Sequence, residues 1–193
     1  MELILQKVCG RSAQLPIRLR RCGPADAAAF FALQNEVRAA MPHPEQFVPD
    51  TLENITAYLR EDLCIGAYGQ NAGDEADTGA YDGERLGAYF ILRYCGRSAH
   101  NYAAFLGVPR EEWEHWANAD SAVVHPDWRG NGLQRKLLEA ALPLVRPGIV
   151  GIGATVSPEN QYSLNNALAC GFVIADRREM YGGYDRYLLK KLL

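Results

Sequence analysis

The sequence predicts one α/β domain in which a mixed central sheet of about six to seven strands is flanked by helices. Short runs rich in β-branched and aromatic residues alternate along the chain with segments of helical periodicity. The chain has 193 residues, of which 48% are hydrophobic, and this is enough for a single domain with a sizeable core. We therefore expect residues 1–193 to form one domain.

The first half of the chain is expected to hold three strands and two helices. The second helix should begin at Asp50 or Thr51, where Asp50 and Glu53 have the spacing of a capping box. Pro24 favours a helix start before the first helix. In order, the expected elements are a strand at 16–21, a helix at about 24–39, a helix from 50 or 51, and strands at 63–68 and 86–94 on either side of a polar loop at 69–83.

The second half opens with an aromatic-rich segment at about 97–116, which lies between the third and fourth expected strands. Pro109, followed by charged residues, indicates a helix start near the end of this segment. The last two strands are expected to pair across a turn at Gly182–Gly183. The remaining elements are a strand at 119–124, a helix at about 130–145, a strand at 149–156, a helix at 161–169, and strands at 172–177 and 184–189.

The most informative segment of the chain is 123–133. A β-branched pair leads into a proline turn, and a basic loop with two glycines then opens into a helix of apolar periodicity. A helix N-terminus leaves backbone N–H groups free and carries about half a positive charge, which suits a phosphate group. Gly130 and Gly132 let a ligand approach the backbone, and Arg129 adds a cation. The segment predicts a pyrophosphate-binding turn.

This segment resembles the coenzyme A-binding motif of the GNAT acetyltransferase superfamily, which is Arg/Gln-x-x-Gly-x-Gly/Ala after a strand that ends in Val-x-Pro. Arg129, Gly132 and Val124-His125-Pro126 match the motif, whereas Gln134 stands where glycine or alanine is usual. The order of the expected elements is also that of GNAT domains, so the resemblance covers nearly the whole chain. It implies the GNAT fold, with a V-shaped splay between the strands on either side of the coenzyme site.

A second motif agrees with the first. Asn160 and Ser163, followed by Gly171-Phe172, resemble the later GNAT motif Asn-x-x-Ala/Ser with a downstream Gly-Phe. In the family, this asparagine bonds to the pantetheine arm of the coenzyme. Asparagine also caps helices and glycine ends them, and both roles can hold together. Many members carry a tyrosine on this helix as general acid, and Ala167 occupies that position here.

The resemblance implies acetyl-CoA as cosubstrate and no metal. A long side chain at Gln134 is compatible with binding if it folds away from the start of its helix. The residues expected to bind the coenzyme come from the two motifs and the strand before the first of them. They are Val123, Val124, Arg129, Gly130, Asn131, Gly132, Leu133, Gln134, Asn160 and Ser163.

The resemblance also implies an N-acetyltransferase that moves an acetyl group from acetyl-CoA directly to a primary amine of a small molecule or peptide. The backbone around Val124, where the family's strand bulges, is expected to bind the acetyl carbonyl. Asp120 is a candidate general base, because it shares a face with Val124 in an unbroken strand, and it is equally a solvated carboxylate. Tyr162 is a candidate catalytic hydroxyl, with Tyr181 and Tyr184 as alternatives. His125 is expected to be structural.

The acceptor is the least defined part of the prediction. Aromatic and acidic residues from the first two helices and from 97–116 would suit a cationic amine. Those on 97–116 are expected, more simply, to form a small core of their own. The residues concerned are Phe47, Tyr102, Phe105, Trp113 and Trp116, with Glu111, Glu112 and Glu114.

Two other functions are compatible with parts of the sequence. Ala167 and Gln134 favour a non-catalytic acyl-CoA-binding or regulatory module of the same fold. An unrelated nucleotide-binding α/β protein is disfavoured, because the loop lacks the last glycine of a dinucleotide fingerprint and the chain has no Gly-Lys-Ser/Thr sequence.

Composition limits the partners. A formal net charge of −3 argues against nucleic acid, and no apolar run approaches the ~20 residues that span a membrane. The chain start lacks a signal-peptide pattern. Five scattered cysteines, none in Cys-x-x-Cys spacing, indicate a cytoplasmic protein rather than a disulfide or zinc framework. We expect acetyl-CoA and a small amine as partners, with a homodimer left open.

Overall fold

The computed structural model describes residues 1–44, 47–70 and 84–193. Four α-helices and eight strands make up the described chain. The helices are α1 (Ala27–Ala39), α2 (Leu52–Glu61), α3 (Leu133–Ala141) and α4 (Gln161–Ala169). The strands are β1 (Glu2–Val8), β2 (Arg11–Arg21), β3 (Leu63–Gln70), β4 (Glu84–Arg93), β5 (Trp116–Val124), β6 (Gly151–Val156), β7 (Val173–Met180) and β8 (Tyr184–Leu192).

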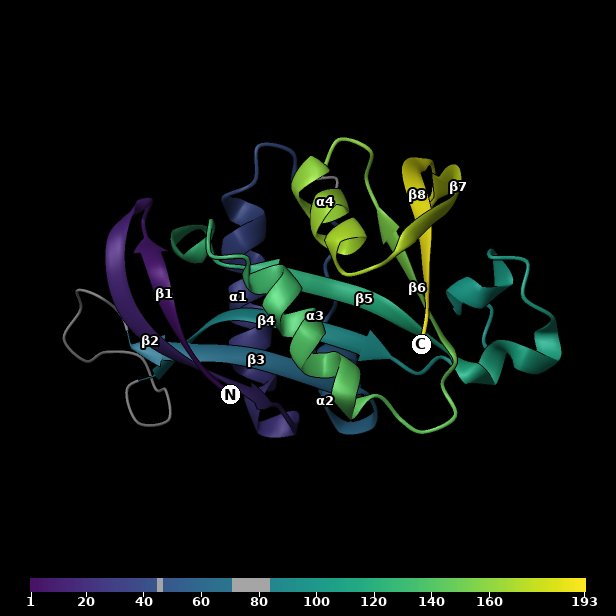
Figure 1. Cartoon of the computed structure of the whole chain (residues 1–193), viewed down its shortest axis with the longest axis horizontal. Helices are drawn as coiled ribbons and strands as arrows, with labels where there is room; N and C mark the ends of the chain where they lie inside the picture. The colour runs from purple at the N-terminus through teal and green to yellow at the C-terminus, as the bar shows by residue number, and fades with distance from the viewer. Residues whose placement is uncertain (45–46, 71–83) are drawn as a thin grey trace.

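All eight strands form one sheet in the order β1-β2-β3-β4-β5-β6-β8-β7 (Figure 1). Neighbouring strands are antiparallel except β5 and β6, which are parallel. The mixed α/β sheet is confirmed, and it has slightly more strands than predicted. The polar loop expected at 69–83 falls almost entirely outside the described residues.

The strand that the sequence did not predict is β1, and β2 begins five residues earlier than expected. β1 pairs with β2 across a turn in which Cys9 and Gly10 both have positive φ angles. Only Leu5 of β1 is fully buried, and Ile4 is 51% exposed. An edge strand with one buried side chain carries little periodic signal, which explains the omission.

The helices cover both faces of the sheet. In Figure 1, α1 and α2 lie behind it, and α3 and α4 lie in front. The rear core includes Phe30 of α1 stacked on Tyr89 of β4, with 4.3 Å between ring centroids. The front core includes Leu137 of α3 packed with Ile152 of β6. Two separate hydrophobic cores therefore hold the sheet from either side.

Thr51, one of the two predicted starts of the second helix, caps α2, because its Oγ1 accepts a hydrogen bond from the Asn54 N–H at 3.1 Å. One helix boundary differs from the prediction. The helix expected at 130–145 is α3 only to Ala141, and a 3₁₀ turn at Leu142–Leu144 follows. Pro143 in this turn cannot continue the α-helix, because it lacks an N–H.

The 97–116 segment contains 3₁₀ turns at Tyr102–Ala104 and Arg110–His115 rather than an α-helix. Two buried amides hold it. The Asn101 Nδ2 donates to the carbonyl oxygens of Gly96 and Trp113, and the Asn118 Oδ1 accepts from the Tyr102 N–H. Tyr102 packs with Met180 and Leu188, and Phe105 lies against this cluster. The small core therefore forms against β7 and β8, rather than within the segment alone as the sequence had led us to expect.

The splay between β5 and β6 is the feature that creates the site. These strands pair only over Trp116–Ala119 and Gly151–Ala154, and they separate beyond that point. In the β4–β5 ladder, Ile91 faces Ser121 and Leu92 faces Ala119, so Asp120 is an extra residue. This β-bulge was expected around Val124, and the structure places the irregularity at Asp120 instead. The V-shaped opening implied by the resemblance is therefore present.

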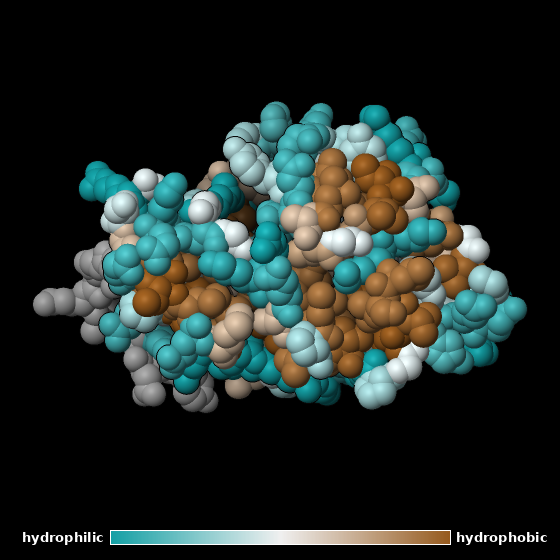
Figure 2. All heavy atoms as spheres, viewed as in Figure 1, coloured by the Kyte–Doolittle hydropathy of each residue, from teal (hydrophilic) through white to brown (hydrophobic). Residues whose placement is uncertain are grey.

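Apolar residues gather in several brown patches on the face shown in Figure 2. The exposed apolar side chains of the chain include Val150, Leu192 and Leu193, which are about half exposed or more. Within the described residues, no helix has both the length and the apolar character needed to cross a membrane.

Candidate active site

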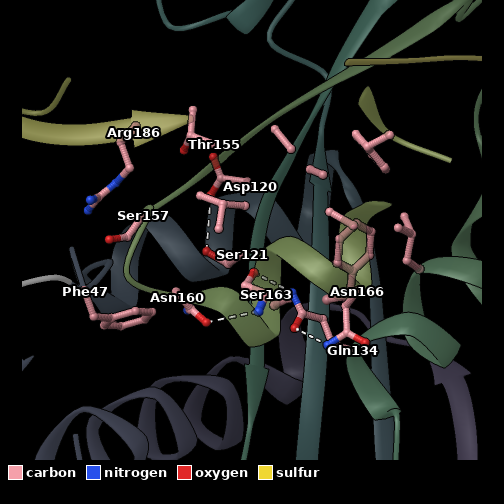
Figure 3. A pocket seen from close by; sticks show the side chains of 18 of the residues that line it. Phe47, Asp120, Ser121, Gln134, Thr155, Ser157, Asn160, Ser163, Asn166 and Arg186 are labelled. Carbon is pink, nitrogen blue, oxygen red and sulfur yellow. Dashed lines mark hydrogen bonds between the residues drawn. The ribbon is translucent and has the colours of Figure 1, made fainter. Parts of the chain in front are cut away.

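A cavity of about 360 Å³ lies where β5 and β6 separate (Figure 3). β5 contributes 119–122, and β6 contributes 154–156 with Ser157 after it. α3 and α4 line a second side. The segment before α2 and the β7–β8 turn line the rest, with Phe47 and Tyr181. The cavity thus collects residues that are far apart in the sequence.

Asp120 lies in this cavity, because the bulge gives it no partner across the β4–β5 ladder. Its Oδ1 is 3.4 Å from the Arg93 Nη1, and its Oδ2 accepts a hydrogen bond from the Ser121 hydroxyl at 3.4 Å. Burial disfavours the charged carboxylate and raises the pKa of Asp120 to about 6, although Arg93 acts in the opposite direction. A carboxylate of this kind can accept a proton near neutral pH.

Arg93 is shared among three carboxylates. Its guanidinium lies over the Tyr58 ring, 4.1 Å from the centroid, and its Nε is 3.9 Å from the Asp62 Oδ2. The Nε–H is buried and makes no hydrogen bond with any described residue. Asp50 lines the same cavity, and burial also raises its pKa. Arg93 therefore acts on Asp50, Asp62 and Asp120, and Arg146 acts on Asp62 as well.

Three hydroxyl groups meet at another wall of the cavity. The Tyr181 hydroxyl is 2.7 Å from the Tyr102 hydroxyl and 2.9 Å from the Thr155 Oγ1. Tyr181 has a φ of 55°, a left-handed conformation that costs a non-glycine residue about 1–2 kcal/mol. Burial raises the pKa of both phenols, so they remain protonated. Tyr181 as a whole is 44% exposed and lines the cavity, whereas Tyr162 is 87% exposed and does not.

The predicted phosphate-binding turn begins α3. Gly132 is the N-cap, with a left-handed φ of 66° and open space where a Cβ would stand. None of the described side chains caps this end, so its first N–H groups can receive an anion. Arg129 and Gly130 are exposed beside it. The residues present at this turn fit a pyrophosphate.

Two side chains anchor the turn rather than face a ligand. The Asn131 Oδ1 accepts from the N–H groups of Gln6 and Lys7, at 2.9 and 3.1 Å, so only its backbone is available. Trp128 is buried against β4, where a Cβ on Gly87 would lie 2.1 Å from the Trp128 Cε3. β1 and β4 together fix the position of the turn.

Gln134 folds away from the start of α3, which was the condition set by the sequence. Its Nε2 donates to the Ser163 Oγ at 2.8 Å, and its Oε1 accepts from the Asn166 Nδ2 at 3.2 Å. Asn160 caps α4 by accepting from the Ser163 N–H at 3.0 Å. Figure 3 shows this chain of contacts beside the cavity, which Ala167 also lines. Gln134 thus ties α3 to α4 and leaves the N-terminus of α3 open.

Other predicted residues lie outside the cavity. Val123 is buried in the rear core and Leu133 in the front core, where Val124 also packs. His125 Nδ1 accepts from the Asp127 N–H in a 3₁₀ turn at Pro126–Trp128, which supports its structural interpretation. Of the acceptor candidates, only Phe47 and Tyr102 line the cavity. Phe105, Trp113, Trp116, Glu111, Glu112 and Glu114 do not.

The sequence did not identify Asp50, Arg93 or Thr155 as cavity residues. The sequence predicted Asp50 only as a possible helix cap, and it placed Arg93 only near the end of a strand. No motif joins these residues, which approach one another through the sheet. In the ranges that the structure describes, no three side chains of His, Cys, Asp or Glu gather as metal ligands would.

Comparison with solved structures identifies the fold. A GNAT-family acetyltransferase from Streptococcus pneumoniae matches with a TM-score of 0.63 at 19% identity, over 92% of this chain and 99% of that chain. NAA60 from Arabidopsis thaliana, in complex with acetyl-CoA, matches with a TM-score of 0.67 at 15% identity, over 92% and 99%. A ribosomal-protein-alanine N-acetyltransferase from Brucella melitensis matches with a TM-score of 0.63 at 17% identity, over 91% and 99%.

The sequence itself matches no family model and no curated protein. The structural matches span more than nine-tenths of the chain, and they establish that it has the GNAT fold.

Proposed function

We propose that this protein is an N-acetyltransferase that transfers the acetyl group of acetyl-CoA directly to a primary amine. The observation that carries the proposal is the largely buried Asp120 carboxylate, with a pKa of about 6, at the point where β5 and β6 separate. The matches to acetyltransferases of the same fold support it.

The coenzyme is proposed to lie in the opening between β5 and β6, from the N-terminus of α3 to Asp120. Arg129 and the backbone from Gly130 to Gln134 would hold the pyrophosphate, and Asn160 and Ser163 would border the pantetheine arm. β5 beyond Ala119 has no β6 partner in the described sheet, so its backbone as far as Val123 and Val124 can pair with that arm. When bound, acetyl-CoA supplies the thioester that the amine attacks.

The chemistry requires a proton acceptor and a proton donor. Asp120 would take the proton that the amine nitrogen loses as its bond to the carbonyl carbon forms and the carbon–sulfur bond breaks. Tyr181 would protonate the departing sulfur, and Tyr102 and Thr155 orient its hydroxyl. Tyr181 takes the role first considered for Tyr162, because its hydroxyl lies at the cavity and Tyr162 is exposed.

The same proposal includes a cytoplasmic location for the protein and acetyl-CoA as its coenzyme. All five cysteines are free of disulfides, which supports a cytoplasmic location. Calorimetry with acetyl-CoA, ATP and NAD tests the coenzyme, and we expect binding of acetyl-CoA alone.

Thiol release in the presence of polyamines, amino acids and aminoglycosides tests the reaction. Release that depends on one amine class would support the transferase. Tight acetyl-CoA binding with no release for any amine would favour the non-catalytic module, for which the alanine at Ala167 is the structural argument.

A further inference from the structure

Asp50 is held in the cavity by contacts from both rear helices. Gln34 of α1 is 1% exposed, its Nε2 donates to the Asp50 carbonyl oxygen at 2.6 Å, and its Oε1 accepts from the Asp50 N–H at 3.1 Å. The Tyr58 hydroxyl of α2 donates to the Asp50 Oδ1 at 3.0 Å. In the described part of the chain, nothing donates to the Asp50 Oδ2. The carboxylate is therefore fixed in position with one oxygen left for a ligand.

The charges around Asp50 favour a cation. Arg93 is the cation that acts on both Asp50 and Asp120, so these two carboxylates face one guanidinium, whereas Asp62 interacts with Arg146 as well as with Arg93. The charge of Asp50 also raises the pKa of Asp120, so the two carboxylates lie close enough to interact. A bound ammonium group would relieve this repulsion.

The two carboxylates differ in what they can do. Asp50 has a phenol donor that favours its charged form, whereas Asp120 is the more strongly affected by burial. Two neighbouring carboxyl groups in different environments can take different roles in catalysis. Asp50 is fixed to the rear helices by Gln34 and Tyr58 and is placed to bind, whereas Asp120 stands where β5 and β6 separate and is placed to react.

We infer that the acceptor is an amine with a second positive charge, which Asp50 binds while the reacting amine lies at Asp120. This inference rests on the proposed acetyl transfer and names the substrate class of that site. Phe47, on the same cavity wall as Asp50, gives the alkyl chain of such a diamine an apolar surface.

Arg186 offers the contrasting possibility of an acceptor with a carboxylate. It is 6% exposed and lines the cavity, and its Nη1 donates to the Asp185 carbonyl oxygen at 3.0 Å. In Figure 3 its guanidinium points away from Asp120. Because Asp50 and Asp120 share the interior with Arg93, an acceptor carboxylate placed beside them would be repelled.

The test uses three primary amines with a four-carbon chain: putrescine, butylamine and 4-aminobutanoate. They share the reacting group and differ only in the far end, which is an ammonium, a methyl or a carboxylate. We expect kcat/KM for putrescine to exceed that for butylamine by about tenfold or more, as expected for one charge-assisted hydrogen bond. The value for 4-aminobutanoate should be the lowest.

Asp50→Asn tests the assignment. The substitution keeps an oxygen for Tyr58 and leaves the backbone contacts with Gln34, so the fold should be preserved. We expect the preference for putrescine over butylamine to fall to near parity. Glu53→Gln is the matched control, because it makes the same charge change on the exposed first turn of α2 and should keep the preference.

Three outcomes overturn the inference. An undiminished preference in Asp50→Asn would remove Asp50 from acceptor binding. A wild-type preference for 4-aminobutanoate would assign the far end to Arg186. Transfer to another amine of the wider panel but to none of these three would overturn this inference and leave the proposed transfer reaction standing.

Discussion

The guanidinium of Arg93 lies 3.4 Å from the carboxylate of Asp120, yet the pKa of Asp120 is raised to about 6. Burial in the opening between β5 and β6 raises the pKa of Asp120 by more than the charge of Arg93 lowers it. The Arg93 Nε is also 3.9 Å from the Asp62 Oδ2, so its charge is shared. The bulge that places Asp120 inside the sheet opening therefore gives it the properties of a base.

This balance predicts a pH dependence. The groups that act on Asp120 are Arg93 of β4, Asp50 before α2, the Ser121 hydroxyl, and burial. Because the base must be deprotonated, kcat/KM should fall as pH decreases through about 6. Arg93→Gln removes the favourable charge, so this limb should move to higher pH. A pH profile of the two proteins checks the prediction, and a limb that stays in place or moves lower would contradict it.

Asp120 also predicts a pH-dependent stability. Folding raises its pKa from 3.8 to about 6, so its ionisation destabilises the folded state as pH rises across that interval. Above pH 6 the full penalty is about 3 kcal/mol, at 1.36 kcal/mol per unit. Asp120→Asn should therefore be more stable than the wild type at pH 7, with a smaller difference at pH 4.5. Urea unfolding at the two pH values measures the difference in stability. Lower stability of the variant at pH 7 would contradict the prediction that the ionised, largely buried carboxylate destabilises the fold.

Tyr181 is predicted to donate a proton in the reaction. Tyr181→Phe removes the hydroxyl that bonds to Tyr102 and Thr155, and kcat should fall by about tenfold or more. Steady-state kinetics should be compared with those of Tyr162→Phe, since Tyr162 was the tyrosine favoured by the sequence. A loss confined to Tyr162→Phe would reverse the assignment.

The turn before α3 is predicted to bind the coenzyme, whereas the contacts of Gln134 are predicted to stabilise the fold. A binding experiment and an unfolding experiment distinguish these two roles. Arg129→Ala removes a cation beside the open helix end, so the Kd for acetyl-CoA should rise by about tenfold or more. Gln134→Ala breaks the contacts with Ser163 and Asn166 and should lower the free energy of unfolding by about 1 kcal/mol per hydrogen bond, with little change in that Kd. Calorimetry and urea unfolding give both quantities. A large gain in affinity for Gln134→Ala would mean that the native side chain obstructs the coenzyme.

Local sequence patterns were sufficient for the turn before α3 and for α4. Glycine at Gly132 and the Asn160 cap act within a few residues of their position, and the structure shows both as helix N-caps. The order of elements followed from periodicity in the same way, apart from the edge strand β1 with its one buried side chain.

The contacts that give the cavity its charge could not be read from the sequence. Asp50, Arg93 and Asp120 belong to three distant segments, and only the pairing of β4 with β5 and the packing of α2 bring them together. The bulge at Asp120 depends on ladder register, which no glycine or turn residue marks. The direction of Gln134 likewise depends on α4, 29 residues later.

The most direct test of the account is acetyl transfer by the wild type and by Asp120→Asn, with acetyl-CoA and putrescine, followed as N-acetylated product and free thiol. We expect equal amounts of product and thiol from the wild type. We expect a loss of about a hundredfold or more in Asp120→Asn, with unchanged affinity for acetyl-CoA. Transfer by Asp120→Asn at the wild-type rate would contradict the account.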